Sequence, residues 1–286
     1  MLKVDEAFRA SLRYARYTRN TLKTRESICK RYLEEFWQNS DMMSITAEQV
    51  QSFVNWLFNE KKLASSYVRH ILEVFHVILS KCQKLQLLDR VPEFPRIVAD
   101  STRTRFLSPD EARLILDLLQ EMSPLWHDIV LLTLNTGMRL GEVVSLKGEN
   151  VDPVNRIIIL LKTKNGKKRV IPLNDDALAV CRKYCRRANE YLFESPVKKG
   201  MHVHKSSHFF IKALKKTTIN QGYSDRHRIC FHSLRHTFAS WLVQEGVRLE
   251  IVSDLLGHSS VVTSQRYAHL APDAGRAAVA KLPSLT

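Results

Sequence analysis

The sequence lacks any long hydrophobic run. No apolar stretch approaches the ~20 residues that a helix needs to span a bilayer. The opening residues Met1 to Glu6 are mixed with charges and do not have the pattern of a secretory signal peptide. These absences argue against a membrane-spanning or secreted protein.

Cysteine is scarce and irregularly placed. The five cysteines are odd in number and scattered, so they suggest no disulfide framework. Cys181 and Cys185 lie one helical turn apart, but no second Cys/His pair follows at zinc-binding spacing. We therefore expect reduced cysteines that serve packing in a cytoplasmic protein.

The sequence also has no nucleotide-binding loop ending in Gly-Lys-Ser/Thr, and no acidic cluster with metal-ligand spacing. Acidic residues are too few to balance the basic ones: 44 Lys and Arg against 29 Asp and Glu give a net charge of +15 and a pI near 9.7. Residues 1–100 contribute +4 and the remainder contributes +11. This excess predicts a polyanionic partner. The missing loop and acidic cluster fit a chemistry that uses neither cofactor nor metal.

The first ninety residues have helical periodicity throughout. Apolar positions recur at helical spacing after Thr21, after the Ser44–Thr46 region and after Ser65, which predicts a bundle of about four helices. Basic residues alternate with tyrosines near the start of the chain, where they suit either a phosphate-facing surface or an ordinary solvated helix face (Arg9, Arg13, Tyr14, Arg16, Tyr17, Arg19, Lys23 and Arg25).

Residues 91–106 interrupt this pattern with two prolines and several polar residues, and they are predicted to form a linker. Ser108-Pro109-Asp110-Glu111 then provides an N-cap, a first-turn proline and a capping-box glutamate. Apolar β-branched runs at 156–161 and 168–173 flank Asn165-Gly166 and predict a β-hairpin. Helices are expected on both sides of this hairpin, including one over 232–245, one over 249–256 and a last one that contains Tyr267.

Two arginines are placed to bind an anion. Arg139 follows Gly137 at the start of a predicted helix, where backbone N–H groups favour negative charge. Arg235 lies one helical turn after His232. Two guanidinium forks of this kind can hold the non-bridging oxygens of a phosphate and stabilise a pentacovalent transition state.

Lys164 directly precedes the Asn165-Gly166 turn, from which its side chain could reach a DNA groove and protonate a leaving oxygen. Its neighbours at the hairpin tip could equally contact phosphates, and composition alone does not single out Lys164 (Lys162, Lys167, Lys168 and Arg169).

His232 and His258 could position a phosphate or assist proton movement near neutral pH. His236 and His269 are predicted to be structural. Tyr267 is a candidate nucleophile, but a phenol with an ordinary pKa of ~10 needs positive charge or a base nearby to react at neutral pH.

Four motifs, taken in order, resemble the tyrosine recombinase (integrase) family. They are Thr136-Gly137-Met138-Arg139-Leu140-Gly141-Glu142, His232-Ser233-Leu234-Arg235-His236-Thr237, Leu255-Leu256-Gly257-His258, and the spacing of nine residues from His258 to Tyr267. The resemblance implies phosphate-clamping roles for Arg139 and Arg235, a general-acid role for Lys164, and the nucleophile role for Tyr267. It also makes His232 and His258 the two active-site histidines and Glu142 a supporting acidic residue.

The resemblance implies a mainly α fold with a small β-sheet. Residues 1–90 are similar to the helical, SAM-like core-binding domain, 91–106 form the linker, and 107–270 form an α+β catalytic domain. The tail 271–286 has a short apolar pattern that could pack on a neighbouring subunit or on its own domain. The chain ahead of the bundle is too short for an additional arm-binding domain, so a simple two-domain recombinase is expected.

The implied activity is site-specific DNA recombination through a 3′-phosphotyrosyl intermediate, without metal or ATP. The implied partners are double-stranded DNA with a specific recombination site and a homo-tetramer on two duplexes, and an accessory DNA-bending protein is left open. The biological setting would be phage or transposon integration and excision, or the resolution of replicon and chromosome dimers. Two alternatives remain: relaxation of DNA in the manner of a type IB topoisomerase, and a catalytically silent DNA-binding regulator.

Overall fold

The chain divides into two compact units, Met1–Thr102 and Arg103–Thr286. The structure is a computed structural model that describes residues 1–12, 17–98, 105–160, 168–185, 187–204, 207–225, 227–258 and 260–271. Several predictions fall outside these ranges: the hairpin tip with Lys164, part of the linker, and the tail from residue 272.

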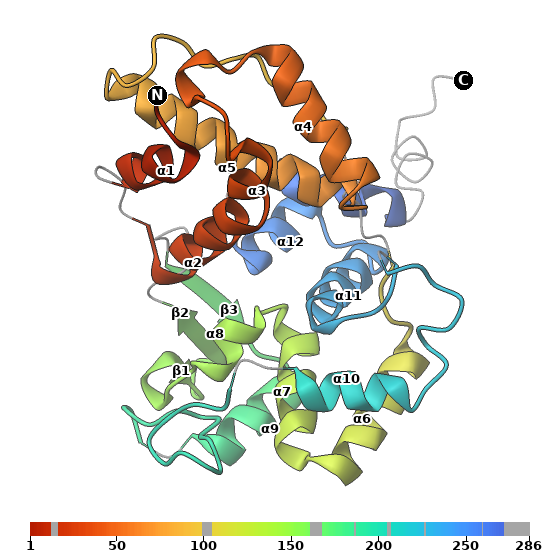
Figure 1. The fold of residues 1–286 in the computed structure, drawn as a ribbon. Coiled ribbons are helices and arrows are strands. Elements are labelled where there is room, and N and C mark those ends of the chain that lie inside the picture. Colours follow the sequence, from red (N-terminus) through yellow and green to blue (C-terminus); the bar gives the residue numbers. More distant parts are fainter. Residues whose placement is uncertain are drawn as a thin grey trace, which may run out of the picture. The chain divides into compact units, whose positions relative to one another are not determined.

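The N-terminal unit is helical in the part that the structure describes (Figure 1). A π-helical segment joins α2 to α3, so that the three form one continuous rod. The elements are α1 (Val4–Leu12), α2 (Arg19–Ile28), the π segment (Cys29–Leu33), α3 (Glu34–Trp37), a 3-10 turn (Met42–Ser44), α4 (Ala47–Asn59) and α5 (Ser65–Lys84). The expected bundle of about four helices is therefore present.

Local sequence chemistry sets the helix ends of this unit. Thr46 caps α4 and forms a reciprocal capping box with Gln49. Aromatic rings from three helices then meet in the core, where Trp37, Phe53 and Phe75 are at most 1% exposed. The ring centroids of Trp37 and Phe75 lie 5.5 Å apart. This contact packs α3, the last part of the rod, against α5.

The C-terminal unit contains seven α-helices and a three-stranded antiparallel sheet among its described residues (Figure 1). The helices are α6 (Pro109–Met122), α7 (Pro124–Thr136), α8 (Leu140–Val144), α9 (Asp175–Tyr184), α10 (His208–Lys215), α11 (Phe231–Gln244) and α12 (Leu249–Leu256). Short 3-10 helices follow the last of these at Val261–Thr263 and Gln265–Leu270, and another precedes the sheet at Gly148–Asn150.

The sheet has the order β1 (Val151–Asp152), β2 (Ile157–Leu160) and β3 (Arg169–Pro172). The two predicted strands pair as β2 and β3, with Ile158 opposite Ile171. Both of these isoleucines are buried, because alternation along the strands turns them towards the helices. The short β1 was not predicted from the sequence, since two residues are too few to show alternation.

Helix α7 passes through the centre of this unit and packs against α6, α9 and α11. Of its thirteen residues, eight are buried, which explains why it is apolar on several faces rather than one. The predicted capping box at Ser108 and Glu111 is present at the start of α6. The predicted fold class, mainly helical with a small antiparallel sheet, is confirmed.

No helix among the described residues is long and apolar enough to cross a membrane.

Candidate active site

Arg139 stands at a break between two helices. Helix α7 ends at Gly137, whose backbone is left-handed (φ +61°), and Arg139 is the N-cap residue of α8. A Cβ on Gly137 would lie 2.4 Å from the ring of Phe238, so this position requires glycine for space as well as for conformation. The chain therefore reverses sharply here and directs the Arg139 side chain back towards α8.

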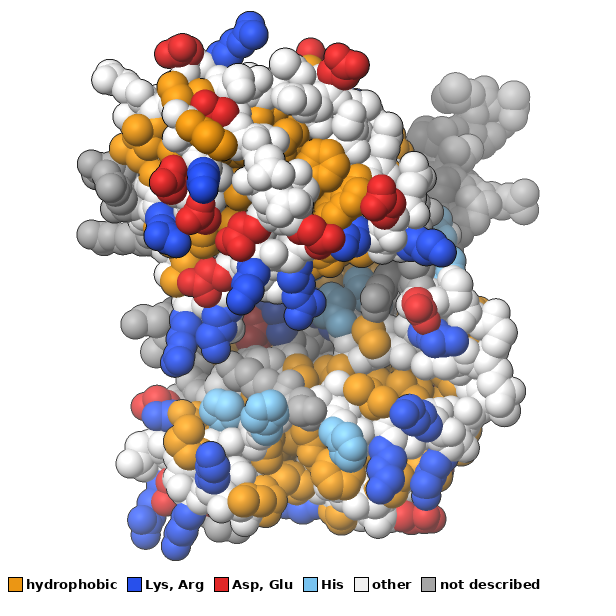
Figure 2. Space-filling view, viewed as in Figure 1, with side chains coloured by type: hydrophobic (Ala, Val, Ile, Leu, Met, Phe, Trp, Pro, Cys, Tyr) orange, Lys and Arg blue, Asp and Glu red, His pale blue; other side chains and the backbone are white. Residues whose placement is uncertain are grey.

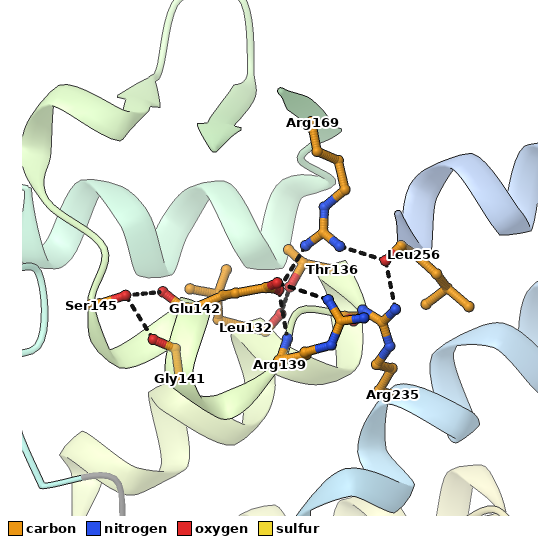
Figure 3. Close-up of polar contacts among 10 residues, drawn as sticks. Leu132, Thr136, Arg139, Gly141, Glu142, Ser145, Arg169, Arg235 and Leu256 are labelled. Atoms are coloured by element: carbon orange, nitrogen blue, oxygen red, sulfur yellow. Dashed lines mark hydrogen bonds and ion pairs between the residues drawn. The ribbon is translucent and has the colours of Figure 1, made fainter. Parts of the chain in front are cut away.

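Glu142 connects two arginines (Figure 3). Its Oε1 accepts from Nη1 of Arg139 at 2.9 Å, and its Oε2 accepts from Nη2 of Arg169, also at 2.9 Å. Oε2 also accepts from the backbone N–H of Arg139, as a capping glutamate does. Burial alone would raise the pKa of Glu142, but Arg169 and Arg139 hold this pKa below its ordinary value, so the carboxylate is ionised.

Arg235 is held by backbone carbonyls. It lies on α11 with its side chain 3% exposed, and it donates from Nη1 to the carbonyl of Gly137 at 2.8 Å and from Nη2 to that of Leu256 at 2.5 Å. The Leu256 carbonyl also accepts from Nη1 of Arg169 at 2.5 Å. The ends of α7 and α12 thus fix the guanidinium of Arg235. In the close-up, Arg169 links the Glu142 carboxylate, which also binds Arg139, to the Leu256 carbonyl, which also binds Arg235 (Figure 3).

This convergence is electrostatically costly without an anion. Burial first, and then the nearby charges of Arg139 and Arg169, lower the pKa of Arg235 to about 9. The group is still protonated at neutral pH, so three guanidinium cations face a single carboxylate. An anion bound between them would offset the cost of burying this charge, which makes the cluster a preorganised anion site.

Helix α12 ends at Gly257 and delivers His258 beside the arginines. Gly257 is left-handed (φ +64°), and a Cβ there would meet Cδ of Arg169 at 2.8 Å. Nδ1 of His258 lies 2.8 Å from the hydroxyl of the fully buried Ser264. Burial first, and then Arg235, Arg139, Arg266 and Arg169, lower the pKa of His258 to about 4, so its imidazole is neutral at pH 7.

His258 should make the stability of the fold sensitive to acid. In the unfolded chain a histidine titrates near ~6.5, so between about pH 6.5 and pH 4 the unfolded state binds a proton that the folded state does not. The free energy of unfolding should therefore fall as the pH drops through this window, and the His258→Gln variant should show a shallower fall. Urea titrations at half-unit steps from pH 7.5 to 4 measure both slopes. If the free energy of unfolding falls equally steeply with pH in both proteins, the lowered pKa of His258 is contradicted.

Tyr267 lies on the 3-10 helix Gln265–Leu270 and is 5% exposed. Its ring joins a small apolar cluster with Ala239, Val243, Val252 and Leu256. Its hydroxyl lies 2.6 Å from Nδ1 of His236 on α11. Burial raises the pKa of Tyr267, although Arg266 and Arg235 partly oppose the rise, so the phenol is protonated in this arrangement.

The structure brings some of the predicted site residues together and leaves others apart. Arg139 and Glu142 are connected to Arg235 through Arg169 and the Leu256 carbonyl, and His258 and Tyr267 lie within the electrostatic reach of Arg235. His232 is exposed at the beginning of α11 and contacts the ring of His236 edge to face, at 4.9 Å between centroids. Lys164 lies outside the described residues.

Two residues of this site were not recognised from the sequence. Arg169 was grouped with the exposed basic residues of the hairpin tip, but it is 5% exposed and joins Glu142 to the Leu256 carbonyl. The alternation of β3 offered a clue, since Arg169 and Ile171 share the buried face of the strand. His236 was predicted to be structural, and no sequence pattern shows that its partner is the hydroxyl of Tyr267.

Within the ranges that the structure describes, no group of three or more His, Cys, Asp or Glu side chains is placed to hold a metal ion. The buried thiols are also unsuited to ligation or nucleophilic attack, because burial raises the pKa of Cys29 and of Cys181 to about 12.

Comparison with known proteins assigns this arrangement to a family. Residues 105–273 match the model of the phage integrase family, which is more than half of the chain. Residues 5–87 match the model of the phage integrase N-terminal SAM-like domain. The chain belongs to the phage integrase family. The resemblance stated from the motifs is confirmed, and with it the predicted class of enzyme, a site-specific tyrosine recombinase.

Relatives of this phage integrase family member come from phages and from cellular genomes. The integrase of Salmonella phage P22 is 31% identical over 197 residues, which are 66% of this chain and 49% of that protein. A tyrosine recombinase of Thermosipho africanus is 26% identical over 99% of this chain and 100% of its own length. The chain thus spans about half the length of the first relative and the whole length of the second.

Solved integrase structures share the fold. The Tn1549 transposon integrase in complex with transposon right end DNA has a TM-score of 0.79 at 19% identity, covering 99% of this chain and 100% of that one. A lambda integrase tetramer bound to a Holliday junction has a TM-score of 0.70 at 19% identity, covering 90% of this chain and 76% of that one. Both of these structural neighbours are integrases bound to DNA.

Proposed function

We propose that this recombinase cuts and rejoins DNA through a 3′-phosphotyrosyl link to Tyr267, with Arg139 and Arg235 holding the phosphate that is attacked. The observation that supports this most directly is the linked cluster of three guanidinium groups around a single carboxylate. Arg139 and Arg169 bind Glu142, and Arg235 shares the Leu256 carbonyl with Arg169. A phosphodiester carries the negative charge that this cluster lacks. The pentacovalent transition state carries more, so the cluster would stabilise it further.

Arg235 and Arg139 contribute in different ways. Two carbonyls hold the guanidinium of Arg235 without neutralising it, so its position does not have to be reorganised when DNA binds. Arg139 is 36% exposed and is oriented by Glu142, so it can meet a phosphate that approaches from solvent. Bidentate contacts from both would fix the phosphorus for in-line attack.

His258 is suited to donate a hydrogen bond rather than a charge. Its imidazole is neutral at pH 7, and where Nδ1 accepts from the Ser264 hydroxyl, the proton is on Nε2. Nε2–H would then bind a non-bridging oxygen beside the arginines. His232, which is exposed at the beginning of the same helix as Arg235, is proposed to contact the phosphate from the solvent side.

Tyr267 would supply the nucleophilic oxygen and Lys164 the proton for the leaving 5′-oxygen. Attack forms the bond from the phenolic oxygen to phosphorus and breaks the bond from phosphorus to the 5′-oxygen. The 5′-hydroxyl of a partner strand reverses the step, so the energy of the phosphodiester is retained in the intermediate.

The role of Lys164 has its own test. Lys164→Ala should slow cleavage of an ordinary substrate by about 10²- to 10⁴-fold, the usual range for a lost general acid. A substrate with sulfur in place of the bridging 5′-oxygen needs no proton on its leaving group, so it should be cleaved at nearly the unaltered rate. Single-turnover cleavage of both substrates measures this, with Lys162→Ala as the matched control. An equal loss on both substrates would leave Lys164 as a phosphate contact.

The N-terminal unit would provide a second DNA-binding surface. Four exposed basic residues lie on α2 and the π segment: Arg19, Lys23, Lys30 and Arg31. Figure 2 shows Lys and Arg side chains gathered along the edge of this unit where α2 lies. The ring of Tyr17 instead packs under Arg25 at 4.1 Å and near Lys81 at 4.6 Å. Part of the tyrosine and arginine row thus serves local packing, and the exposed cations remain for phosphates.

The complete reaction would take place in a homo-tetramer on two duplexes that carry a specific recombination site. Two strand exchanges between two duplexes require four nucleophiles, and a lambda integrase of the same fold has been solved as a tetramer bound to a Holliday junction. A recombination assay with the purified protein as the only protein tests for an accessory factor. Recombination in this assay would mean that no DNA-bending protein is required.

The test of the function uses a nicked suicide duplex drawn from DNA that flanks the gene. The protein is incubated with this duplex in EDTA and without ATP, and a denaturing gel resolves covalent protein–DNA complex from free DNA. We expect an adduct that resists denaturation. If none forms with this duplex, and supercoiled plasmid is neither bound nor relaxed, the proposed chemistry is wrong.

A further inference from the structure

The hydroxyl of Tyr267 has a partner that its proposed role as nucleophile does not explain. Nδ1 of His236 lies 2.6 Å from this hydroxyl, which is a short and well-formed hydrogen bond. The two rings are tilted against each other at 5.9 Å between centroids. Both residues are nearly buried, His236 at 7% and Tyr267 at 5% exposure, so water does not readily compete for this contact.

We propose that His236 is a further catalytic residue of this recombinase: it aligns the Tyr267 hydroxyl and accepts its proton as the phenolic oxygen attacks the phosphate. This rests on the proposed role of Tyr267. In the step, the O–H bond of Tyr267 breaks and its proton moves to Nδ1 of His236, while the oxygen lone pair forms the bond to phosphorus. In the reverse step, His236 returns the proton to the departing phenolic oxygen.

The surroundings of the phenol make a proton acceptor necessary. An ordinary tyrosine is ionised to roughly one part in a thousand at pH 7, given a pKa of ~10. Here burial raises the pKa further, so spontaneous ionisation is rarer still. Arg235 and Arg266 lie near enough to lower this pKa in part, but a guanidinium can donate protons and cannot accept one. The ring itself packs among apolar side chains of α11 and α12.

His236 is well placed for this task because of its position on α11. It follows Arg235 directly, and consecutive residues of a helix point about 100° apart, so one turn presents the phosphate-binding guanidinium and the imidazole to different sides. Arg235 points to the ends of α7 and α12, whereas His236 points to the 3-10 helix of Tyr267. The same rigid helix therefore sets the phosphate and the nucleophile relative to each other.

His232 is less suited to contact the phenol. It lies one helical turn before His236 and is exposed, and its ring contacts that of His236 edge to face at 4.9 Å between centroids. Its position is nearer solvent than the buried hydroxyl. We therefore assign the contact with the nucleophile to His236, and leave the contact with the phosphate to His232.

The experiment separates proton acceptance from mere positioning. In His236→Asn the amide lies close to where Nδ1 was, so it can keep a hydrogen bond to Tyr267 but cannot take up a proton. His236→Leu removes both. Each variant is combined with tyrosine or 3,5-difluorotyrosine at position 267, because the fluorinated phenol is more acidic and needs less help to lose its proton. The readout is the single-turnover rate of adduct formation on the nicked duplex, with DNA binding and thermal unfolding measured in parallel.

If His236 accepts the proton, His236→Asn should form adduct about 10²-fold more slowly at unchanged DNA binding. Difluorotyrosine should then speed the Asn variant at least tenfold more than it speeds the unaltered protein. An Asn variant as fast as the unaltered protein, or an equal effect of fluorination on both, would overturn the proposal. If the Asn variant does not fold, His236→Gln is subjected to the same comparison.

Failure of this inference is distinguishable from failure of the proposed function. If the unaltered protein forms adduct at Tyr267, but fluorination speeds the His236→Asn variant no more than it speeds the unaltered protein, only the role of His236 as proton acceptor is wrong. If the unaltered protein forms no adduct at Tyr267, the nucleophile itself is wrong, and the assignment of His236 falls with it.

Discussion

Tyr267→Phe should abolish the covalent protein–DNA complex while DNA binding stays within about twofold of the unaltered protein. The substitution removes one oxygen, and in the proposed reaction that oxygen forms the bond to phosphorus. No other described group can replace it from the same place, because the ring is enclosed by α11 and α12 and contacts His236 through its hydroxyl. The loss should be on the order of 10⁴-fold or more, as for removal of other catalytic nucleophiles.

The measurement is adduct formation on the nicked duplex at pH 7, with band shift of the same duplex under native conditions. Tyr223→Phe is the matched control, because it removes the same oxygen from a side chain that is 44% exposed and whose ring lies under Arg105. This control should form adduct at the unaltered rate. Persistence of the adduct in Tyr267→Phe would place the nucleophile elsewhere in the chain.

Arg169→Met should destabilise the C-terminal unit by about 3 kcal/mol. Arg169 is 5% exposed, and its loss would remove one of the two ion pairs of the largely buried Glu142 carboxylate together with the hydrogen bond to the Leu256 carbonyl. Breaking a buried ion pair by removing one partner typically costs 3–5 kcal/mol, because an uncompensated charge remains. Methionine preserves most of the volume of the side chain beside Gly257, so the loss reports charge and hydrogen bonds rather than a cavity.

Lys168→Met is the control for this experiment. It removes the same charge from the adjacent residue, which is exposed, so its effect on the free energy of unfolding should stay within about 0.5 kcal/mol. Adding Glu142→Gln to Arg169→Met should recover part of the loss, since the buried carboxylate is then neutral. Urea unfolding of the unaltered protein, Arg169→Met, Glu142→Gln and the double variant measures this cycle, with Lys168→Met unfolded in parallel as the control. If Arg169→Met and Lys168→Met lower the free energy of unfolding equally, Arg169 is an exposed residue of the hairpin and the buried ion pair with Glu142 is contradicted.

Arg169→Met should also slow DNA cleavage, even at temperatures where the variant stays folded. Arg169 and Arg235 share the Leu256 carbonyl, and Glu142 aligns Arg139, so Arg169 contacts the supports of both phosphate-binding arginines. Loss of one preorganised donor from such a site often costs 10²- to 10³-fold. Because Arg169 acts through its neighbours, we expect a smaller loss, roughly tenfold.

Local sequence rules predicted most of the secondary structure. Ser108 to Glu111 contained every element of a helix start, and α6 begins there with the capping box formed. Arg139 was expected at the start of a helix after Gly137, and it is the N-cap residue of α8. These features depend on neighbouring residues alone, so no tertiary information was needed to predict them.

The predictions were less complete where packing decides the conformation. The helix expected around Tyr267 is a short 3-10 helix, and part of the helix after Thr21 is a π segment. The strand β1 exists because Val151 and Asp152 pair with Ile158 and Ile157, which their own sequence does not reveal.

The sequence by itself determined the helix and strand pattern, the basic charge and the ordered motifs that place this chain in its family. Those properties depend on side-chain type and spacing along the chain. Tertiary structure alone decided that Arg169 is buried against Glu142 and the Leu256 carbonyl, and that His236 contacts Tyr267. These partners lie 27 to 87 residues apart in sequence, and only the packing of α8, α11 and α12 brings their polar atoms within hydrogen-bonding distance.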